Sequence, residues 1–220
     1  MLFNSFAFLV FFPIVISLYY ILPHKFRWML LLAASYFFYM YWEPAYIILI
    51  VASTLIDYSV GIAMGKKETK RQKRPLLLLS LFANLGMLFT FKYFNFFNAQ
   101  IGDLADALNI EYSVPFLELL LPVGISFYTF QTLSYTIDLY YGKIKTERHL
   151  GKFALYVAFF PQLVAGPIER AKHLLGQFHQ KMVFNYENFT WGLKLAVWGL
   201  FKKVVVADRL AVYVDTVYSA

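Results

Sequence analysis

Residues Leu119–Tyr141, LLLPVGISFYTFQTLSYTIDLYY, form an apolar run that contains several polar side chains. It is as long and apolar as a helix must be to cross a ~30 Å hydrocarbon layer, which takes about 20 residues. It also carries a glutamine, several hydroxyls and an aspartate, and such side chains within a membrane face protein or water. The stretch therefore predicts a membrane-spanning helix with a polar side.

Other apolar runs precede this one and set the class of protein. They are residues 5–22, 28–42, 45–64 and 76–97. Of the 220 residues, 60% are hydrophobic and 15% are charged, and the mean hydropathy is +0.56. Soluble domains are about 45–50% apolar and about 25% charged, and one core of this size could not bury the excess. The composition excludes a soluble globule and a disordered chain. The first run has no basic stretch before it and no small-residue cleavage site after it, so we expect a retained helix.

The charged residues predict the orientation of the chain. We expect a short basic turn at residues 23–27, with Lys25 and Arg27, and a basic loop at residues 65–75, with Lys66–Arg74. If each run crosses once, these two clusters and a third, Lys143–Lys152, fall on one side. Glu43 and the acidic connection 98–118 fall on the other side. Short loops rich in Lys and Arg stay in the cytoplasm, so we expect the N-terminus outside. The net charge of +7 and pI of about 9.4 are thus explained by orientation, and no nucleic-acid partner is expected.

The pattern changes after Lys152. Residues 153–165 are apolar but reach only about 20 Å as a helix, contain Pro161 and are followed by Gly166-Pro167. Broken backbone at membrane depth is tolerated where protein or a wet cavity surrounds it, so we expect a re-entrant or broken element entering from the cytoplasm. Residues 168–182 predict an amphipathic helix in the cytoplasmic interface. Residues 189–210 are apolar but carry charges, and predict a segment that spans or dips into the membrane.

The predicted fold is therefore all-α. We expect a polytopic transmembrane helical bundle with about six to seven spanning or re-entrant segments. Residues 1–220 are expected to form a single transmembrane domain.

Polar residues within the runs mark the candidate site. Gln131, Ser134, Tyr135 and Asp138 are spaced to form one stripe on a helix, and Thr129, Thr132 and Thr136 form a second stripe beside it. Both stripes lie toward the cytoplasmic end, which predicts a polar cavity opening to the cytoplasm. The alternative for the hydroxyls is hydrogen bonding between helices. Ser53, Asp57 and Gly61 repeat the theme in the third run, where the small-polar-small face favours close helix packing.

No catalyst is visible in the residues themselves. His24, His149, His173 and His179 lie outside the confident spans and are interpreted as solvated side chains on a basic surface. The chain has no HExxH, GxSxG, P-loop or GxGxxG pattern, and its acidic residues are too scattered to predict a metal site. The absence of cysteine excludes a disulfide framework, a thiolate zinc site and a cysteine nucleophile.

Four motifs resemble one enzyme family. They are Phe159–Arg170 (FFPQLVAGPIER), Phe91–Phe97 (FKYFNFF), Leu121–Asp138 (LPVGISFYTFQTLSYTID) and Phe201–Leu210 (FKKVVVADRL). In the same order along the chain, they resemble segments of the membrane-bound O-acyltransferase (MBOAT) family. The segments are most similar to the bacterial branch of the family that includes the membrane subunit of the alginate O-acetyltransferase, which acts in the cell envelope.

The resemblance implies a helical bundle in the bacterial inner membrane, with a funnel on each side that meets at a buried histidine. An acyl thioester, acetyl-CoA or an acyl carrier protein, would arrive from the cytoplasm as a substrate, and no cofactor would be bound. The acceptor would be a hydroxyl of an extracellular polysaccharide or cell-wall glycan. An extracytoplasmic acetyltransferase would act as a partner protein. Gln131, Ser134, Tyr135 and Asp138 would line the donor funnel, and Gln162 and Arg170 would contact the anionic carrier.

The chain also departs from the family pattern. The family histidine lies in the C-terminal half, and none of the four histidines here falls in a matching motif. We therefore expect an N-terminal portion that is incomplete relative to the family, with no catalytic residue of its own, and inactive alone. The alternatives are a transporter or flippase, disfavoured because no internal repeat is evident, and a non-catalytic membrane scaffold.

Overall fold

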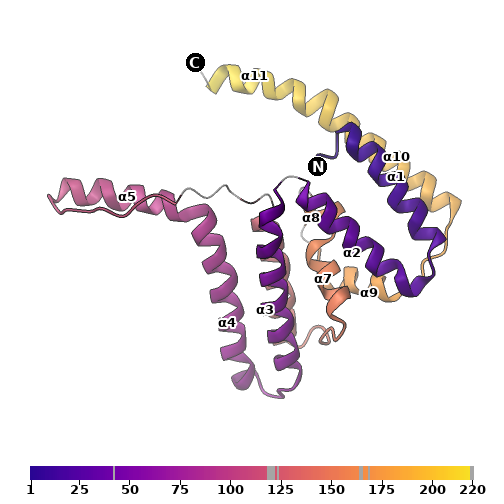
Figure 1. Cartoon of the computed structure of the whole chain (residues 1–220), viewed down its shortest axis with the longest axis horizontal. Coiled ribbons are helices and arrows are strands. Elements are labelled where there is room, and N and C mark those ends of the chain that lie inside the picture. The colour runs from indigo at the N-terminus through magenta and orange to yellow at the C-terminus, as the bar shows by residue number, and fades with distance from the viewer. Residues whose placement is uncertain (42, 118–121, 123, 164–165, 168, 219–220) are drawn as a thin grey trace. The chain divides into compact units, whose positions relative to one another are not determined.

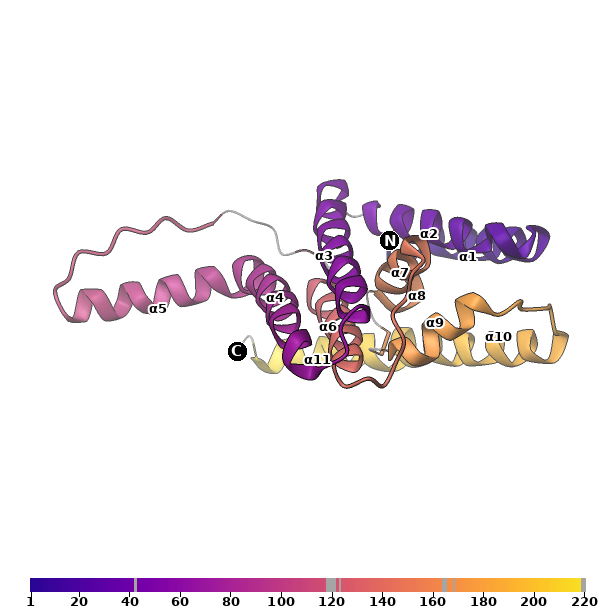
Figure 2. The ribbon, with the colours of Figure 1, turned by 90° about the horizontal axis from the view of Figure 1, so that it is seen from below.

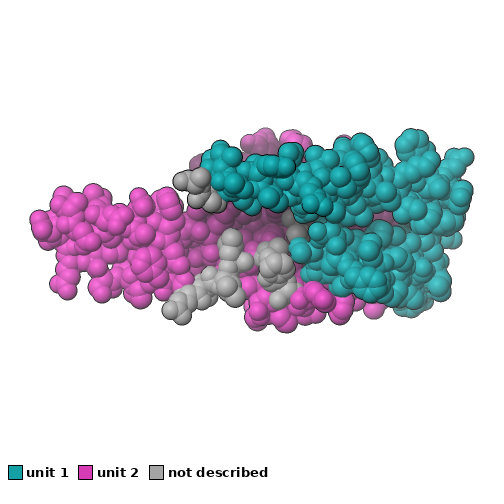
Figure 3. Space-filling model, turned by 90° about the horizontal axis from the view of Figure 1, so that it is seen from above, with its two compact units in different colours: residues 1–27, 181–220 teal, residues 28–180 magenta. Residues whose placement is uncertain are grey.

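The computed structural model describes residues 1–41, 43–117, 122, 124–163, 166–167 and 169–218. Throughout these residues every regular element is a helix, which confirms the all-α prediction. The chain divides into two compact units, coloured separately in Figure 3: residues 1–27 with 181–220, and residues 28–180. The prediction of one transmembrane domain stays a prediction.

Three long helices form the centre of the second unit. They are α3 (Ile47–Gly65), α4 (Lys70–Leu88) and α6 (Ile125–Tyr140), and each packs against the other two (Figures 1 and 2). The short 3-10 helix η1 (Pro44–Tyr46) leads into α3, where Glu43 accepts a hydrogen bond from the Ala45 amide. α2 (His24–Met40) begins in the first unit and continues into the second. The basic turn predicted at 23–27 is therefore wrong for most of its length.

The basic loop predicted at 65–75 is shorter than expected. Thr69 Oγ1 accepts a hydrogen bond from the Gln72 amide at 3.4 Å. This N-cap satisfies one of the amides left free at a helix start, so α4 begins at Lys70 and includes the second half of the basic cluster.

The fourth apolar run continues beyond its predicted end. A π-helical segment, η2 (Phe89–Tyr93), joins α4 to α5 (Phe94–Ala107), and the helix changes direction there (Figure 1). Such π-segments are a recognised cause of helix bends. The connection predicted over 98–118 is therefore helical as far as Ala107. Beyond it the chain folds back, since the Asn95 side chain exchanges two 2.8 Å hydrogen bonds with the Leu117 backbone.

The broken element is present where it was predicted. α7 (Leu150–Ala158) and α8 (Phe160–Leu163) are separated at Phe159, whose backbone leaves the helical region with ψ 109°. Residues 164 and 165 of the predicted segment lie outside the described residues. α9 (Ala171–His179) follows and buries Ala171, Leu174 and Leu175, the apolar face predicted for the amphipathic helix.

The first unit consists of apolar helices. α1 (Phe6–Ile21) agrees with the first predicted run within a residue at each end. α10 (Tyr186–Phe201), the π-segment η3 (Lys202–Ala207) and α11 (Asp208–Tyr218) follow one another and extend past the predicted end at residue 210. Arg27 stabilises this unit by donating hydrogen bonds to the carbonyls of Leu22 and Met182.

Two helical stretches of the described chain are long and apolar enough to cross a membrane. They are Pro44–Gly65 and the bent helix Lys70–Ala107. Phe6–Ile21 and Leu150–Leu163 are apolar but shorter.

Candidate functional site

The candidate site is built around α6. Its N-terminus requires Gly124, which has a positive φ of 78°. A Cβ at this position would lie 2.6 Å from the Leu163 carbonyl oxygen, so glycine also permits the close approach of α8. The two polar stripes predicted on α6 are both present and largely buried, and they contact different neighbours.

The stripe with Gln131 and Ser134 contacts the broken element. The Gln131 side-chain amide donates to the Tyr156 carbonyl at 2.5 Å, and the Tyr156 hydroxyl donates to the Gln131 carbonyl at 3.0 Å. Ser134 donates to the same Gln131 carbonyl at 2.8 Å and lies 3.4 Å from the Tyr156 hydroxyl. A reciprocal pair of hydrogen bonds thus joins α6 to α7.

This arrangement explains why the helix break is tolerated. In a continuous helix the Tyr156 carbonyl would accept from the Phe160 amide. Here Gln131 supplies the donor for the carbonyl, and the Phe160 amide donates instead to Ser35 of α2 at 3.2 Å. Side chains from two neighbouring helices therefore satisfy the backbone groups freed by the break, as irregular backbone in an apolar environment requires.

Gln162 joins the same cluster from α8. Its side-chain oxygen accepts from the Gln131 amide at 3.3 Å, and its own amide donates to the Pro167 carbonyl at 2.8 Å. Gln131 is 3% exposed and Gln162 6% exposed. The structure thus brings together Gln131, Ser134 and Gln162, three of the six predicted site residues, and all their side chains have protein partners.

The other three predicted site residues lie apart from this cluster. Tyr135 is fully buried against Gly61, and its hydroxyl accepts from the Glu147 amide at 3.1 Å. Asp138 lies near the end of α6 and forms a 3.8 Å ion pair with Lys143. Arg170 is exposed immediately before α9. Substrate binding by the six residues stays a prediction.

The second stripe of α6 contacts α3 and α4 through a buried polar cluster. Ser80 donates to Asp57 at 2.5 Å and lies 3.2 Å from the Thr136 hydroxyl. Asn84 donates to the other Asp57 oxygen at 2.8 Å and accepts from Ser53 at 2.7 Å. Thr132 also donates to the Asn84 side-chain oxygen, at 3.4 Å.

The contacts in this cluster indicate that its residues hold the helices together. Every member lies between helices and is hydrogen bonded, and a Cβ on Gly61 would be 2.9 Å from the Tyr135 hydroxyl. The close approach predicted for the Ser53, Asp57 and Gly61 face is therefore present. Ser80 and Asn84 were not among the predicted polar residues, although their four-residue spacing within an apolar run could have revealed them.

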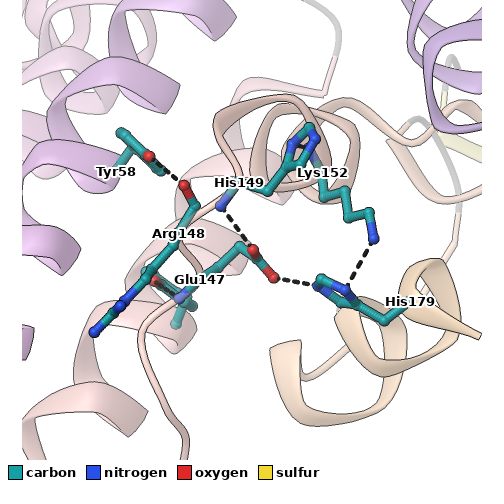
Figure 4. Close-up of polar contacts among 7 residues, drawn as sticks. Tyr58, Glu147, Arg148, His149, Lys152 and His179 are labelled. Carbon is teal, nitrogen blue, oxygen red and sulfur yellow. Dashed lines mark hydrogen bonds and ion pairs between the residues drawn. The ribbon is translucent and has the colours of Figure 1, made fainter. Parts of the chain in front are cut away.

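Two histidines belong to a polar cluster at the start of α7 (Figure 4). Glu147 accepts from the His149 amide at 2.8 Å and lies 2.6 Å from His179 Nε2. Lys152 Nζ lies 2.9 Å from His179 Nδ1. Because an ammonium group only donates, Nδ1 accepts and Nε2 donates to the carboxylate. These contacts fasten α9 to α7, and both histidine side chains remain exposed as predicted.

The chain is similar in sequence to known bacterial proteins. No family model and no solved structure matches the chain. A Pseudomonas putida protein named "Probable alginate O-acetylase AlgI" is 40% identical over an alignment of 220 positions, which covers 98% of this chain and 44% of that protein. Its Pseudomonas aeruginosa namesake is 36% identical over 98% of this chain and 41% of its own length. The chain is a homologue of the N-terminal portion of the alginate O-acetylases. The family resemblance drawn from the four motifs is confirmed.

A further homologue carries a different name. A "Peptidoglycan O-acetyltransferase" of Helicobacter pylori is 34% identical over 84% of this chain and 39% of that protein. The chain thus spans about two fifths of the length of the curated relatives it matches. The alignment with alginate O-acetylases covers nearly the whole chain, so the α6 contacts lie within the matched region.

Proposed function

We propose that this chain is the N-terminal part of a bacterial inner-membrane O-acetyltransferase. The complete enzyme transfers an acetyl group from a cytoplasmic thioester to a hydroxyl of an extracellular polysaccharide or cell-wall glycan. The observation that carries this proposal is 36–40% identity to alginate O-acetylases across 98% of the chain. The Helicobacter pylori relative supports the wider acceptor class, because its name specifies peptidoglycan.

The membrane arrangement follows from the apolar helices. α3 and the bent α4–α5 helix cross the membrane, and α1, α2, α6, α7 with α8, and α10 complete about six to seven spanning or re-entrant segments. One contact supports the orientation: Thr146 donates to the Gly61 carbonyl near the end of α3 at 3.3 Å. The Lys143–Lys152 segment therefore lies at the same end of the helices as the Lys66–Arg74 cluster. That end faces the cytoplasm, and the N-terminus lies outside.

The donor path runs beside the broken element. Amide and hydroxyl groups of Gln131, Ser134 and Gln162 can orient a thioester carbonyl, with hydrogen-bond donors that stabilise the oxyanion formed when the acceptor hydroxyl attacks. In the structure these amides donate to the Tyr156 and Pro167 carbonyls. Substrate contact thus requires that those hydrogen bonds exchange. Tyr135, Asp138 and Arg170 belong to the cytoplasmic end of the path, where the anionic carrier of acetyl-CoA or of an acyl carrier protein approaches.

The remaining machinery belongs to the rest of the enzyme. The general base that accepts the hydroxyl proton comes from the C-terminal half, so this chain alone is inactive. An extracytoplasmic acetyltransferase partner and the polysaccharide acceptor act on the outer side.

A chimera tests this proposal. This chain replaces the matching 44% of the Pseudomonas putida relative, in a strain that lacks its own copy. The chimera is expected to restore ester-linked acetate on secreted alginate, measured by alkaline release and quantification of acetate. The unmodified relative and an empty vector set the upper and lower limits. A chimera that is present in the membrane at the level of the relative but leaves alginate unacetylated would contradict the proposal.

A further inference from the structure

A cavity of about 750 Å³ opens where α3 and α6 end and α4 begins, near the basic segments. Its size is within the range of sites for small organic molecules, about 300–1,000 Å³. All of its lining residues belong to the second unit. They are Ile62, Met64, Gly65, Lys66, Lys73, Leu139, Gly142, Ile144, Lys145, Thr146 and Arg148.

The charges around this cavity have one sign. Lys66, Lys73, Lys145 and Arg148 contribute four cationic side chains, and none of the lining residues is acidic. Within the described ranges, no carboxylate forms an ion pair with any of the four. Lys143, by contrast, is outside the lining and is paired with Asp138. Uncompensated cations around a concave surface raise the local concentration of anions.

The backbone around the cavity is held in place. Thr146 bonds to the Gly61 carbonyl, and a Cβ on Gly65 would lie 2.5 Å from the Thr146 hydroxyl oxygen, so this connection packs closely on α3. Tyr58 of α3 donates to the Arg148 carbonyl at 2.6 Å (Figure 4). The four cations are therefore presented from fixed elements.

The lining combines apolar and cationic side chains. Ile62, Met64, Leu139 and Ile144 supply aliphatic surface beside the four cations. A free inorganic anion would leave that surface exposed to water, whereas a phosphate attached to an apolar molecule would cover both parts. The cavity also lies where apolar helices give way to basic segments, which is the level of the headgroups in a bilayer. Basic pockets between membrane helices on the cytoplasmic side are typical binding sites for phospholipid headgroups.

We propose that this cavity binds the phosphate headgroup of an anionic phospholipid from the cytoplasmic leaflet. The proposal rests on the membrane orientation given above and is separate from acyl transfer. The bound headgroup offsets part of the charge of the four cations and links the adjacent ends of α3, α4 and α6, so its removal is expected to destabilise this end of the second unit.

The test measures lipid binding to the full chain purified in a mild nonionic detergent. Native mass spectrometry with added phosphatidylglycerol or phosphatidylcholine gives the affinity for each lipid. Each lysine that contacts the headgroup is expected to raise the affinity for an anionic lipid about fivefold. The double variant Lys73→Gln with Lys145→Gln is therefore expected to bind phosphatidylglycerol about 25-fold more weakly.

A matched control separates the cavity from general surface charge. Lys67→Gln with Lys70→Gln removes the same amount of charge at the same end of the helices, but neither residue lines the cavity, so this variant is expected to bind as the unmodified chain does. Lys73→Arg with Lys145→Arg keeps the charge and is expected to retain binding. Helix content from circular dichroism shows that each variant is folded.

Three results would overturn the proposal. Equal affinity for phosphatidylglycerol and phosphatidylcholine would remove the requirement for an anionic headgroup. Equal loss of binding in the two glutamine variants would show that surface charge acts without a site. The third result concerns coenzyme A. If coenzyme A binds to the unmodified chain but not to the cavity variant, and that variant still binds phosphatidylglycerol as the unmodified chain does, the ligand of the cavity is a soluble phosphate. The orientation is tested separately by labelling, so its failure is distinguishable from failure of the lipid site.

Discussion

Asn84→Leu is expected to loosen the packing of α3 against α4. Asn84 is 1% exposed, and its side chain forms two close hydrogen bonds with α3, to Ser53 at 2.7 Å and to Asp57 at 2.8 Å. Leucine has a similar size but no polar atoms. Interhelical hydrogen bonds in membrane proteins contribute about 0.6 kcal/mol each on average and at most about 1.7 kcal/mol. The two bonds therefore predict a loss of about 1–3 kcal/mol in the free energy of unfolding. The unpaired Asp57 oxygen favours the upper end of this range.

The assay is unfolding of the purified chain in mild detergent by added denaturing detergent, followed by circular dichroism. Thr90→Val is the matched control, because its hydroxyl bonds only within its own helix, to the Gly86 carbonyl at 3.0 Å. The control is expected to change the free energy of unfolding by less than about 0.5 kcal/mol. If Asn84→Leu is no less stable than Thr90→Val, the buried cluster does not hold the helices together and the reasoning is refuted.

Three further predictions address the break, the packing and the orientation. Gln131→Leu leaves the Tyr156 carbonyl without its side-chain donor, at a cost of about 1–3 kcal/mol in the free energy of unfolding. Amide hydrogen exchange at α7 and α8 should accelerate. The exposed Gln177→Leu is the control, and equal exchange rates in the two variants would contradict this prediction. Gly61→Leu is expected to destabilise the fold by about 1–3 kcal/mol through overpacking. Gly86 has open space around it, so Gly86→Leu is not expected to do so. Equal unfolding midpoints for the two variants would refute the close packing at Gly61. The chain has no cysteine, so a membrane-impermeant thiol reagent on intact cells should label Asp106→Cys but label Glu68→Cys only after permeabilisation; the opposite pattern would reverse the orientation.

The sequence predicted the helices where apolar length decided the outcome. α1 and α3 agree with their runs because each remains predominantly apolar, with Asp57 the one charged residue in α3, until a capping residue or a charged segment. The break near Pro161 was predicted from its short length and proline, and it lies at Phe159. The helix over 98–107 was missed because its acidic residues resemble a loop, although on α5 they occupy an exposed side.

The candidate site was predictable in composition but less so in arrangement. Gln131 and Ser134 were identified as polar groups within a span, and both form buried contacts. The contact of Gln131 with Gln162 depends on where the helix breaks, which periodicity does not specify. The four-residue spacing of Ser80 and Asn84 could have revealed a polar face on α4, but it could not have identified the partners of Asn84, which come from α3 and α6.

The most direct test of the central claim is the amount of ester-linked acetate per uronate in alginate made by the Pseudomonas putida chimera. The claim is that the polar contacts between α6 and the broken α7–α8 element serve acyl transfer. Gln162→Leu is expected to lower the acetate at least tenfold at equal membrane levels, whereas Gln177→Leu on the exposed side of α9 leaves it unchanged. Acetate that is equal in the two variants would show that these buried amides only hold helices together, and would contradict the claim.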